Sequence, residues 1–182
     1  MFLAESQQIA SAYGLEKNGS IIVKDTLMAD GNIAIAKTFF GTSHPLFNAF
    51  GVEVEEIGKG RAVMSLACSH TICNRAGGVH RGAVVTLLDT NCGLAIFSQL
   101  GDMRPIATVD LRVDFINEAP VGEGVYSEVE CFAVQGDIAY VRGRAFVNSD
   151  QTLLASVSGS FAVGTLGPAF DSPITERSQD NV

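Results

Sequence analysis

Asp89 is the only charged residue in the apolar run from Gly82 to Gly101. Burying an isolated carboxylate on an apolar helix is costly unless a partner binds it or a reaction uses it. An ionised carboxylate here could attack a carbonyl carbon, or it could take a proton from water. The structural alternative is a buried Asp that hydrogen-bonds to the backbone or to Thr86 and Thr90. Asp89 is therefore the first candidate for chemistry.

The loop before this run, from Asn74 to Arg81, contains groups that suit a bound carbonyl. Its glycines permit sharp turns, and it delivers the amides of a helix N-terminus, here those of Arg81 and Gly82. Such amides stabilise a polarised carbonyl or a developing oxyanion, and Asn74 can add a side-chain amide donor. His80 is a candidate for proton transfer or orientation, with a helix cap as the structural alternative.

Helix geometry limits how these groups combine. Arg81 and Asp89 are eight residues apart in the sequence, which is about 12 Å along one α-helix. The Asp89 side chain leans toward the helix N-terminus and recovers only a few ångströms of that separation. We therefore predict that two antiparallel copies pair, so that each helix N-terminus faces the partner's Asp89 in two equivalent sites.

The length and composition indicate one domain with tails. The chain has 182 residues, of which 47% are hydrophobic, enough for one sizeable core but not comfortably for two domains. We predict an N-terminal extension of uncertain structure over residues 1–43, a folded domain over 44–164 and a flexible tail over 165–182.

Charge and patterning exclude several classes of protein. A net charge of -8 opposes general binding of nucleic acid or of an anionic membrane. The N-terminus lacks the basic start and continuous apolar core of a secretion signal. The apolar run is long enough to span a bilayer, but Asp89, Asn91 and Gln99 inside it argue against a membrane span. These features predict a soluble cytoplasmic protein.

Alternating segments predict the strands. Residues 107–115 alternate, with Ala107 and Val109 on one face and Thr108 on the other, and similar alternation follows near 125–133, 138–147 and 152–163. Short turns between them predict an antiparallel meander. With two earlier strands near 52–56 and 63–67 and one long helix over 82–100, the pattern is α+β, a single sheet wrapped around the helix.

The cysteines show no C-x-x-C spacing and lie within apolar segments. This pattern favours buried free thiols over disulfides or a metal site for Cys68, Cys73, Cys92 and Cys131. His44 and His70 lack metal-ligand spacing as well. We therefore expect neither a metal nor a redox cofactor.

The stretch N-R-A-G-G-V-H-R-G-A-V-V-T-L-L-D, from Asn74 to Asp89, resembles a known family signature. It is similar to N-x-x-G-x-x-H-G-G-x-x-x-x-L-x-D of hotdog-fold acyl-CoA thioesterases of the phenylacetyl-CoA type, within the 4-hydroxybenzoyl-CoA thioesterase superfamily. The segment A-T-V-D-L-R-V-D-F-I-N-E-A resembles that family's strand after the central helix. The resemblance implies a hotdog fold and homodimers that commonly pair into homotetramers.

The resemblance also implies a role for individual residues. Asp89 matches the family's nucleophile or general base, and Asn74 matches the residue that positions the carbonyl or the lytic water. His80 and Gly82 belong to the matched helix start, whose backbone N–H polarises the thioester. Thr108 stands where relatives have a Ser or Thr that orients the carboxylate or water.

Arg81 departs from the family signature, because it replaces the first Gly of H-G-G. The first position of an α-helix does not require Gly, so Arg81 can still provide the backbone N–H donor there. The Arg81 side chain would either crowd the acyl pocket or contact a coenzyme A phosphate. Val85 and Leu88 are the candidates for contact with the acyl group.

The sequence therefore predicts hydrolysis of an acyl-CoA thioester to a free acid and coenzyme A, at sites shared across a homodimer that pairs further into a dimer of dimers. The first alternative is a 3-hydroxyacyl thioester dehydratase or hydratase, which needs His as its principal base. The second is a non-catalytic acyl-CoA-binding module. A motif alone does not separate these three functions.

Overall fold

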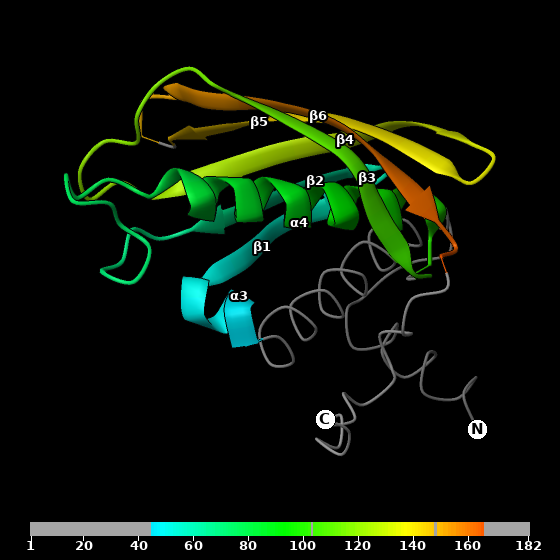
Figure 1. Cartoon of the computed structure of the whole chain (residues 1–182), viewed down its shortest axis with the longest axis horizontal. Coiled ribbons are helices and arrows are strands. Elements are labelled where there is room, and N and C mark those ends of the chain that lie inside the picture. The colour runs from blue at the N-terminus through cyan, green and yellow to red at the C-terminus, as the bar shows by residue number, and fades with distance from the viewer. Residues whose placement is uncertain (1–44, 103, 148, 166–182) are drawn as a thin grey trace, which may run out of the picture.

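A computed structural model of the chain describes residues 45–102, 104–147 and 149–165 (Figure 1). The predicted extension over 1–43 and nearly all of the predicted tail over 165–182 lie outside these residues. In chain order the elements are α3 (Pro45–Phe50), β1 (Val52–Gly58), β2 (Arg61–Leu66), α4 (Arg81–Leu100), β3 (Ile106–Phe115), β4 (Val125–Gln135), β5 (Ile138–Val147) and β6 (Leu153–Val163).

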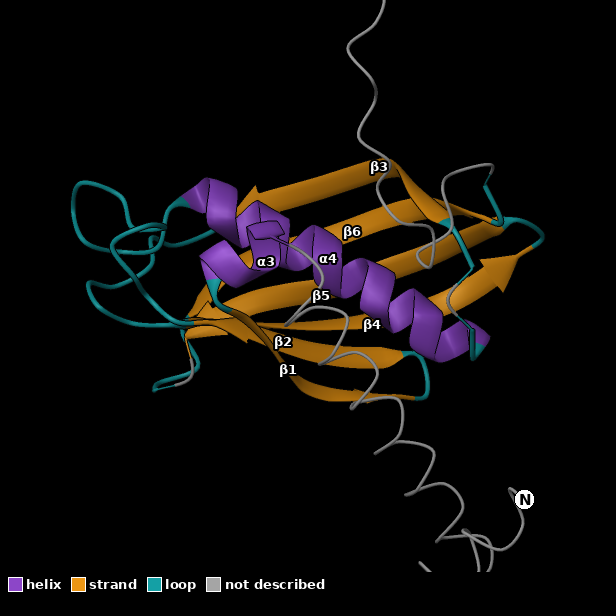
Figure 2. Cartoon of the chain, turned by 90° about the horizontal axis from the view of Figure 1, so that it is seen from below, coloured by secondary structure: helices purple, strands orange, loops and turns teal. Residues whose placement is uncertain are grey.

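One six-stranded sheet has the order β1-β2-β4-β5-β6-β3, and every neighbouring pair in it is antiparallel. The long helix α4 lies across one face of this sheet, and the strands curve around it (Figures 1 and 2). The opposite face of the sheet carries no helix among the described residues. The α+β class and the sheet wrapped around one long helix are thus confirmed.

The predicted meander is wrong at its first strand. β4, β5 and β6 follow one another through short turns, but β3 pairs with β6 at the edge of the sheet rather than with β4. Residues 116–124 connect β3 to β4, and this connection is long enough to pass over the two intervening strands. Alternation predicts that a segment is a strand, but it does not specify which neighbour that strand pairs with.

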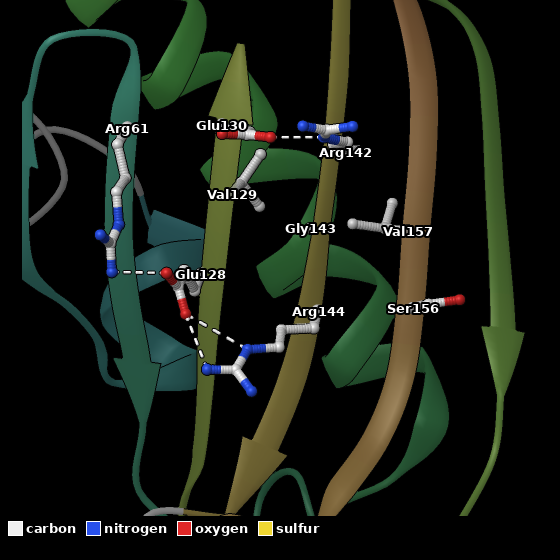
Figure 3. A pocket seen from close by; sticks show the side chains of 9 residues that line it. All are labelled: Arg61, Glu128, Val129, Glu130, Arg142, Gly143, Arg144, Ser156 and Val157. Atoms are coloured by element: carbon white, nitrogen blue, oxygen red, sulfur yellow. Dashed lines mark hydrogen bonds and ion pairs between the residues drawn. The ribbon is translucent and has the colours of Figure 1, made fainter. Parts of the chain in front are cut away.

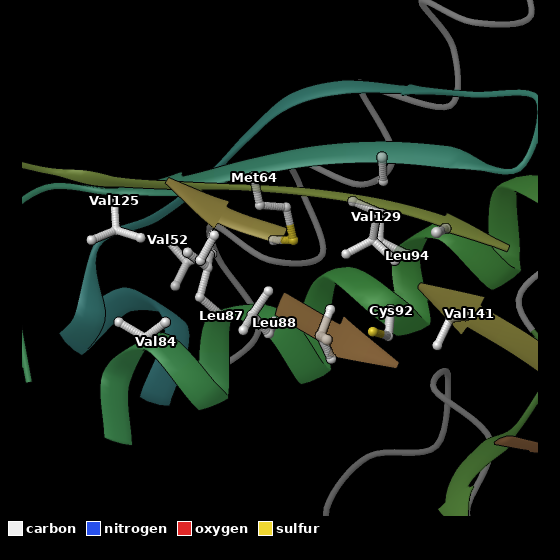
Figure 4. Packing of buried hydrophobic residues seen from close by; sticks show 14 of the residues in the cluster. Val52, Met64, Val84, Leu87, Leu88, Cys92, Leu94, Val125, Val129 and Val141 are labelled. Carbon is white, nitrogen blue, oxygen red and sulfur yellow. The ribbon is translucent and has the colours of Figure 1, made fainter. Parts of the chain in front are cut away.

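The core lies between α4 and the sheet (Figure 4). Leu87 and Leu88 on α4 are completely buried, as is Met64 on β2. Full burial of one such side chain contributes about 1.5–3 kcal/mol relative to exposure. The helix ends at Gly101, whose φ of 74° is the left-handed conformation that favours glycine at a helix C-terminus.

One face of α4 is not fully buried, although residues 82–100 are apolar nearly all round, a pattern typical of a buried helix. Arg81 and Gly82 are exposed, and the half-buried side chains that follow on this face are Val85, Thr86, Asp89 and Thr90. The sheet covers only the opposite face of the helix. By length and composition α4 could cross a membrane, but its most apolar window is 61% buried within the fold, as in the core helix of a globular domain.

Asn91 anchors α4 to the sheet through a buried amide. Its Nδ2 lies within hydrogen-bond distance of the Ala62 carbonyl on β2, at 3.2 Å, and of the Ser127 carbonyl and hydroxyl on β4, at 3.0 Å and 2.8 Å. These three acceptors share its two N–H groups. Asn91 is 0% exposed. These bonds set the rotation of the helix about its axis, and hence the direction in which its opposite face points.

Asn91→Ala is expected to lower the free energy of unfolding by about 3 kcal/mol, because it removes the two buried N–H donors that these acceptors share. Urea denaturation at fixed protein concentration measures this loss as a lower midpoint with unchanged slope. Thr90→Ala, at the half-buried neighbouring position, is the matched control and should change stability by less than about 1 kcal/mol. Equal midpoints for the two variants would contradict the anchoring role of Asn91.

Candidate active site

The loop that leads into α4 is a small hairpin closed by its own hydrogen bonds. Cys73 and Val79 form an antiparallel bridge, and the His80 amide donates to the Ile72 carbonyl at 2.8 Å. Inside this hairpin, Asn74 Oδ1 accepts from the amides of Ala76 at 2.8 Å and Gly78 at 3.3 Å. The carbonyl oxygen of the Asn74 side chain is therefore used by the loop itself.

This arrangement fixes which end of the Asn74 amide is available. Nδ2 makes no hydrogen bond among the residues that the structure describes, whereas Oδ1 makes two. Asn74 is half-buried, so the loop fixes the position of its side chain but leaves part of it accessible. The group that remains available is a hydrogen-bond donor, which suits a carbonyl oxygen or a water.

His80 is the N-cap of α4, which is the structural alternative to a catalytic role. Its backbone is extended, with φ -66° and ψ 138°, and its Nδ1 accepts from the Gly82 amide at 3.0 Å. An accepting Nδ1 carries no proton, so the neutral imidazole holds its proton on Nε2. His80 thus presents an N–H donor at the start of the helix.

The same contact corrects the expected role of Gly82. The sequence predicts that the Gly82 amide is free to polarise a carbonyl, but His80 already occupies it. The preceding amide, that of Arg81, has no acceptor within residues 45–102, 104–147 and 149–165. The helix N-terminus therefore offers the Arg81 N–H directly, and it offers the Gly82 N–H only if the imidazole moves.

Asp89 lies two turns further along the half-buried face of α4. Thr108 Oγ1 on β3 donates to Asp89 Oδ1 at 3.0 Å. The hydroxyl of Thr86 bonds instead to the Gly82 carbonyl of its own helix at 3.0 Å. The carboxylate is thus held from the sheet by one hydroxyl, and Oδ2 makes no hydrogen bond among the described residues.

A β-bulge at Val109 brings Thr108 to that position. Thr108 pairs with Phe161 and Asp110 pairs with Ser160, so Val109 is an extra residue in β3. The bulge reverses the alternation, so that Thr108 shares the inner face with Leu111 while Val109 is 62% exposed. Strict alternation places Val109 inside and Thr108 outside, and both expectations are wrong for this reason.

The predicted substrate-binding residues separate in the structure. Val85 is half-buried on the face of Asp89, whereas Leu88 is 0% exposed in the core and does not reach that face. The Arg81 guanidinium pairs with Glu118 and lies 5.0 Å from the centre of the Phe115 ring. Arg81 is thus engaged with the connection after β3 rather than left as an unpaired cation.

Four further arginines that could bind a coenzyme A phosphate are paired with carboxylates too. Arg104 pairs with Asp102, and Arg112 pairs with Asp114. Arg142 and Arg144 line a groove on the outer face of the sheet, and α4 lies behind that sheet (Figure 3). Their partners there are Glu130 and Glu128 respectively. This groove is on the opposite side of the sheet from Asp89.

The cysteines divide into two kinds, which corrects the prediction of four free thiols. Cys68 and Cys73 are joined by a disulfide with a Cα–Cα distance of 6.4 Å. Cys92 and Cys131 are free and buried. Burial, and then the charge of Asp89, raises the pKa of the Cys92 thiol, so this cysteine stays a protonated core residue rather than a nucleophile.

In the described ranges no group of three His, Cys, Asp or Glu side chains could hold a metal ion.

No hydrogen bond joins Asp89 to Asn74, His80 or Gly82 within the described chain. The described chain instead holds these groups in two separate places along α4 and the loop before it. One is a donor set at the helix start, and the other is an oriented carboxylate two turns away. Together such groups polarise a carbonyl and deliver a nucleophile or an activated water to it. The chemistry of these groups suits hydrolysis of an activated carbonyl compound.

Comparison with known proteins agrees with that chemistry. The sequence model of the thioesterase superfamily matches residues 76–154. The chain is 31% identical over 99 residues to a Pseudomonas aeruginosa protein named "Putative esterase PA0474", an alignment covering 54% of this chain and 72% of that protein. The chain belongs to the thioesterase superfamily.

Solved structures show the same fold. A Pseudomonas aeruginosa protein of known structure is 29% identical, with a TM-score of 0.64 over 72% of this chain and 98% of that chain. The E. coli PaaI protein, from the phenylacetic acid degradation operon, has a TM-score of 0.66 over 78% of this chain and 98% of its own. At 15% identity the second likeness concerns the fold alone. The fold is the hotdog fold that the signature implied.

Proposed function

We propose that this protein hydrolyses acyl-coenzyme A thioesters to a free acid and coenzyme A, at sites shared between two antiparallel copies. Membership in the thioesterase superfamily supports thioester hydrolysis as the class of reaction. The observation that carries the proposal is the Asp89 carboxylate, which Thr108 holds on the half-buried face of α4.

The available donors suit the thioester carbonyl. The Arg81 amide at the helix N-terminus and Asn74 Nδ2 would bind the carbonyl oxygen, where negative charge develops in the transition state. His80 can add its Nε2–H as a third donor or hold a water. The structure uses its Nδ1 as a helix cap, so nothing in it favours the dehydratase alternative, in which this imidazole would be the principal base.

Asp89 of the partner copy would then act in one of two ways. As a nucleophile it forms an acyl anhydride and expels the coenzyme A thiolate, and water later hydrolyses that anhydride. As a general base it takes a proton from water, whose oxygen adds to the carbonyl; the coenzyme A thiolate then leaves and takes that proton from Asp89. Both routes consume one water and end with the carboxylate restored. Oδ1 bonds Thr108 in either route, which leaves Oδ2 to react.

The edge of the sheet supports the antiparallel pairing. β3 pairs only with β6 among the described strands, so its other edge is free to bond another chain. Val109, exposed at the bulge, lies on this edge strand. Two β3 edges that pair antiparallel would join two copies about a twofold axis. We propose this edge as the dimer contact, with the dimer of dimers as a further step.

Complementation tests the shared site directly. A heterodimer of Asn74→Ala and Asp89→Asn subunits, purified through two different affinity tags, contains one site with both changes and one intact site if sites are shared. It should recover about half of the wild-type activity although both parent homodimers are inactive. If each site lay within one copy, the heterodimer would be as inactive as its parents.

The substrate class is tested by release of coenzyme A from short-chain, long-chain and aryl acyl esters. Hydrolysis of at least one ester, without metal or redox cofactor, is the expected result. Tight binding of the esters with no release over hours would instead favour the non-catalytic acyl-CoA-binding module.

A further inference from the structure

We infer that Cys68 and Cys73 are a reversible thiol–disulfide pair that controls the loop carrying Asn74, with a small disulfide of the glutathione type as the reagent. The pair itself is independent of the proposed function. Only its effect on catalysis rests on that function. In cytoplasmic proteins, solvent-accessible cysteine pairs that change oxidation state are typical of redox control. The sequence predicts that this protein is cytoplasmic.

The backbone holds the two cysteines together by itself. The Ser69 carbonyl accepts from the Ile72 amide at 3.1 Å and from the Cys73 amide at 3.0 Å, which closes a turn between the cysteines. Their Cα atoms are 6.4 Å apart, within the range that a disulfide spans. The turn depends on backbone bonds, so the thiols remain neighbours after reduction.

Exposure separates this pair from the other two cysteines. Cys68 and Cys73 are both half-buried, whereas Cys92 and Cys131 are buried in the core. A glutathione-sized reagent can therefore reach the pair in the folded protein. The buried thiols stay protonated and enclosed, because burial raises the pKa of both.

The pair lies at the base of the candidate active-site loop. Cys73 immediately precedes Asn74 and forms the bridge with Val79. Cys68 Sγ lies 3.4 Å from the Gly77 carbonyl oxygen, on the other side of the loop. A bond between the two sulfurs thus fixes Cys73, the residue before Asn74, to Cys68, which itself contacts the far side of the loop at Gly77. Closing this short ring restricts residues 68–73, from which the loop emerges.

The exchange reaction balances without any further reagent. One cysteine thiolate attacks a sulfur of glutathione disulfide, forms a mixed disulfide and expels one glutathione thiolate. The second cysteine then attacks the protein sulfur of that mixed disulfide and expels the second glutathione. Two protein thiols are oxidised, one glutathione disulfide is reduced to two thiols, and the two protons pass to the glutathiones. Excess reduced glutathione drives the reverse reaction.

The first test follows the thiols of the folded full-length protein in glutathione buffers of graded redox ratio. After quenching with acid and alkylation with N-ethylmaleimide, peptide mass spectrometry should show Cys68 and Cys73 titrating together as a two-electron couple. Cys92 and Cys131 should stay thiols at every ratio. Independent alkylation of Cys68 and Cys73 even in pure glutathione disulfide would overturn the inference.

The second test measures the mobility of the loop and the rate of thioester hydrolysis in both redox states. Reduction should raise amide hydrogen exchange at residues 74–80 by about tenfold, because the disulfide no longer fixes Cys73 at the base of the loop. It should lower kcat/KM by about threefold or more, since small displacements of a positioning group are costly. Free coenzyme A is quantified by chromatography, because buffer thiols interfere with thiol dyes.

Matched variants separate the possible outcomes. Cys68→Ser and Cys73→Ser should show the reduced-state values in every buffer, whereas Cys131→Ala should keep the full redox response. Equal exchange and equal kcat/KM in both states of the wild type would overturn control by the pair. No hydrolysis in either state would contradict the proposed function, while the mass and exchange measurements would still decide whether the redox pair exists.

Discussion

Asp89→Asn is expected to lower kcat/KM for acyl-coenzyme A hydrolysis by about 10²–10⁴-fold, the contribution typical of a positioned general base. The asparagine keeps the shape of the side chain, and its Oδ1 can still accept from Thr108 as the carboxylate does at 3.0 Å. The fold and coenzyme A binding should therefore survive. Initial rates of coenzyme A release, together with binding of coenzyme A by calorimetry, measure the two effects separately.

The control for this variant is another Asp→Asn change. Asp137 is exposed in the turn between β4 and β5, and Asp137→Asn alters the net charge by the same amount as Asp89→Asn. It should leave kcat/KM within about twofold, as expected for a surface change away from the site. If Asp89→Asn turned over substrate at the rate of this control, the carboxylate would have no part in the reaction.

Gly78→Ala is expected to damage both stability and activity. A Cβ at Gly78 would stand 2.1 Å from the Ala119 carbonyl oxygen and 3.1 Å from its carbon, so the backbone must shift. The Gly78 amide bonds Asn74 Oδ1, and the Gly78 carbonyl accepts from the Asn74 amide. A shift at Gly78 therefore displaces Asn74. We expect a loss of about 2 kcal/mol in stability and about 10²-fold in kcat/KM.

Gly58→Ala is the matched control, because a Cβ there meets nothing within 4 Å and its φ is not positive. Thermal melts and the coenzyme A release assay compare the two variants under identical conditions. A Gly78→Ala protein with the activity of Gly58→Ala would show that the loop tolerates displacement. It would also remove the geometric reason for assigning the carbonyl site to Asn74.

Local sequence patterns predict most of the elements. Alternation predicts a strand near residues 138–147, and β5 spans Ile138–Val147. The apolar run predicts a long helix over 82–100, and α4 begins one residue earlier at Arg81. Both predictions use the period of apolar residues and the turn signals beside them, which act over a few residues. The spacing from Asn74 to Asp89 likewise identifies the candidate site from the sequence.

Predictions that depend on one specific contact, whether with a distant or a nearby residue, fail or stay open. The edge position of β3 depends on its pairing with β6. The face of the sheet on which the Thr108 side chain lies depends on a β-bulge in that pairing. The closure of Cys68 to Cys73 depends on a backbone turn at Ser69. Occupation of the Gly82 amide by His80 depends on the rotamer of one side chain. None of these contacts produces a periodic pattern of residue types that can be recognised in the sequence.

The amino-acid sequence alone therefore predicts the single long helix and the strands, and it proposes Asn74, His80 and Asp89 as candidate site residues, because periodicity and motif spacing are local properties of the chain. The folded chain specifies strand order, the orientation of Asp89 by Thr108, and which donors remain free at the helix start. Most of these features follow from packing and hydrogen bonding between segments tens of residues apart, whose energies depend on geometry that exists only after folding.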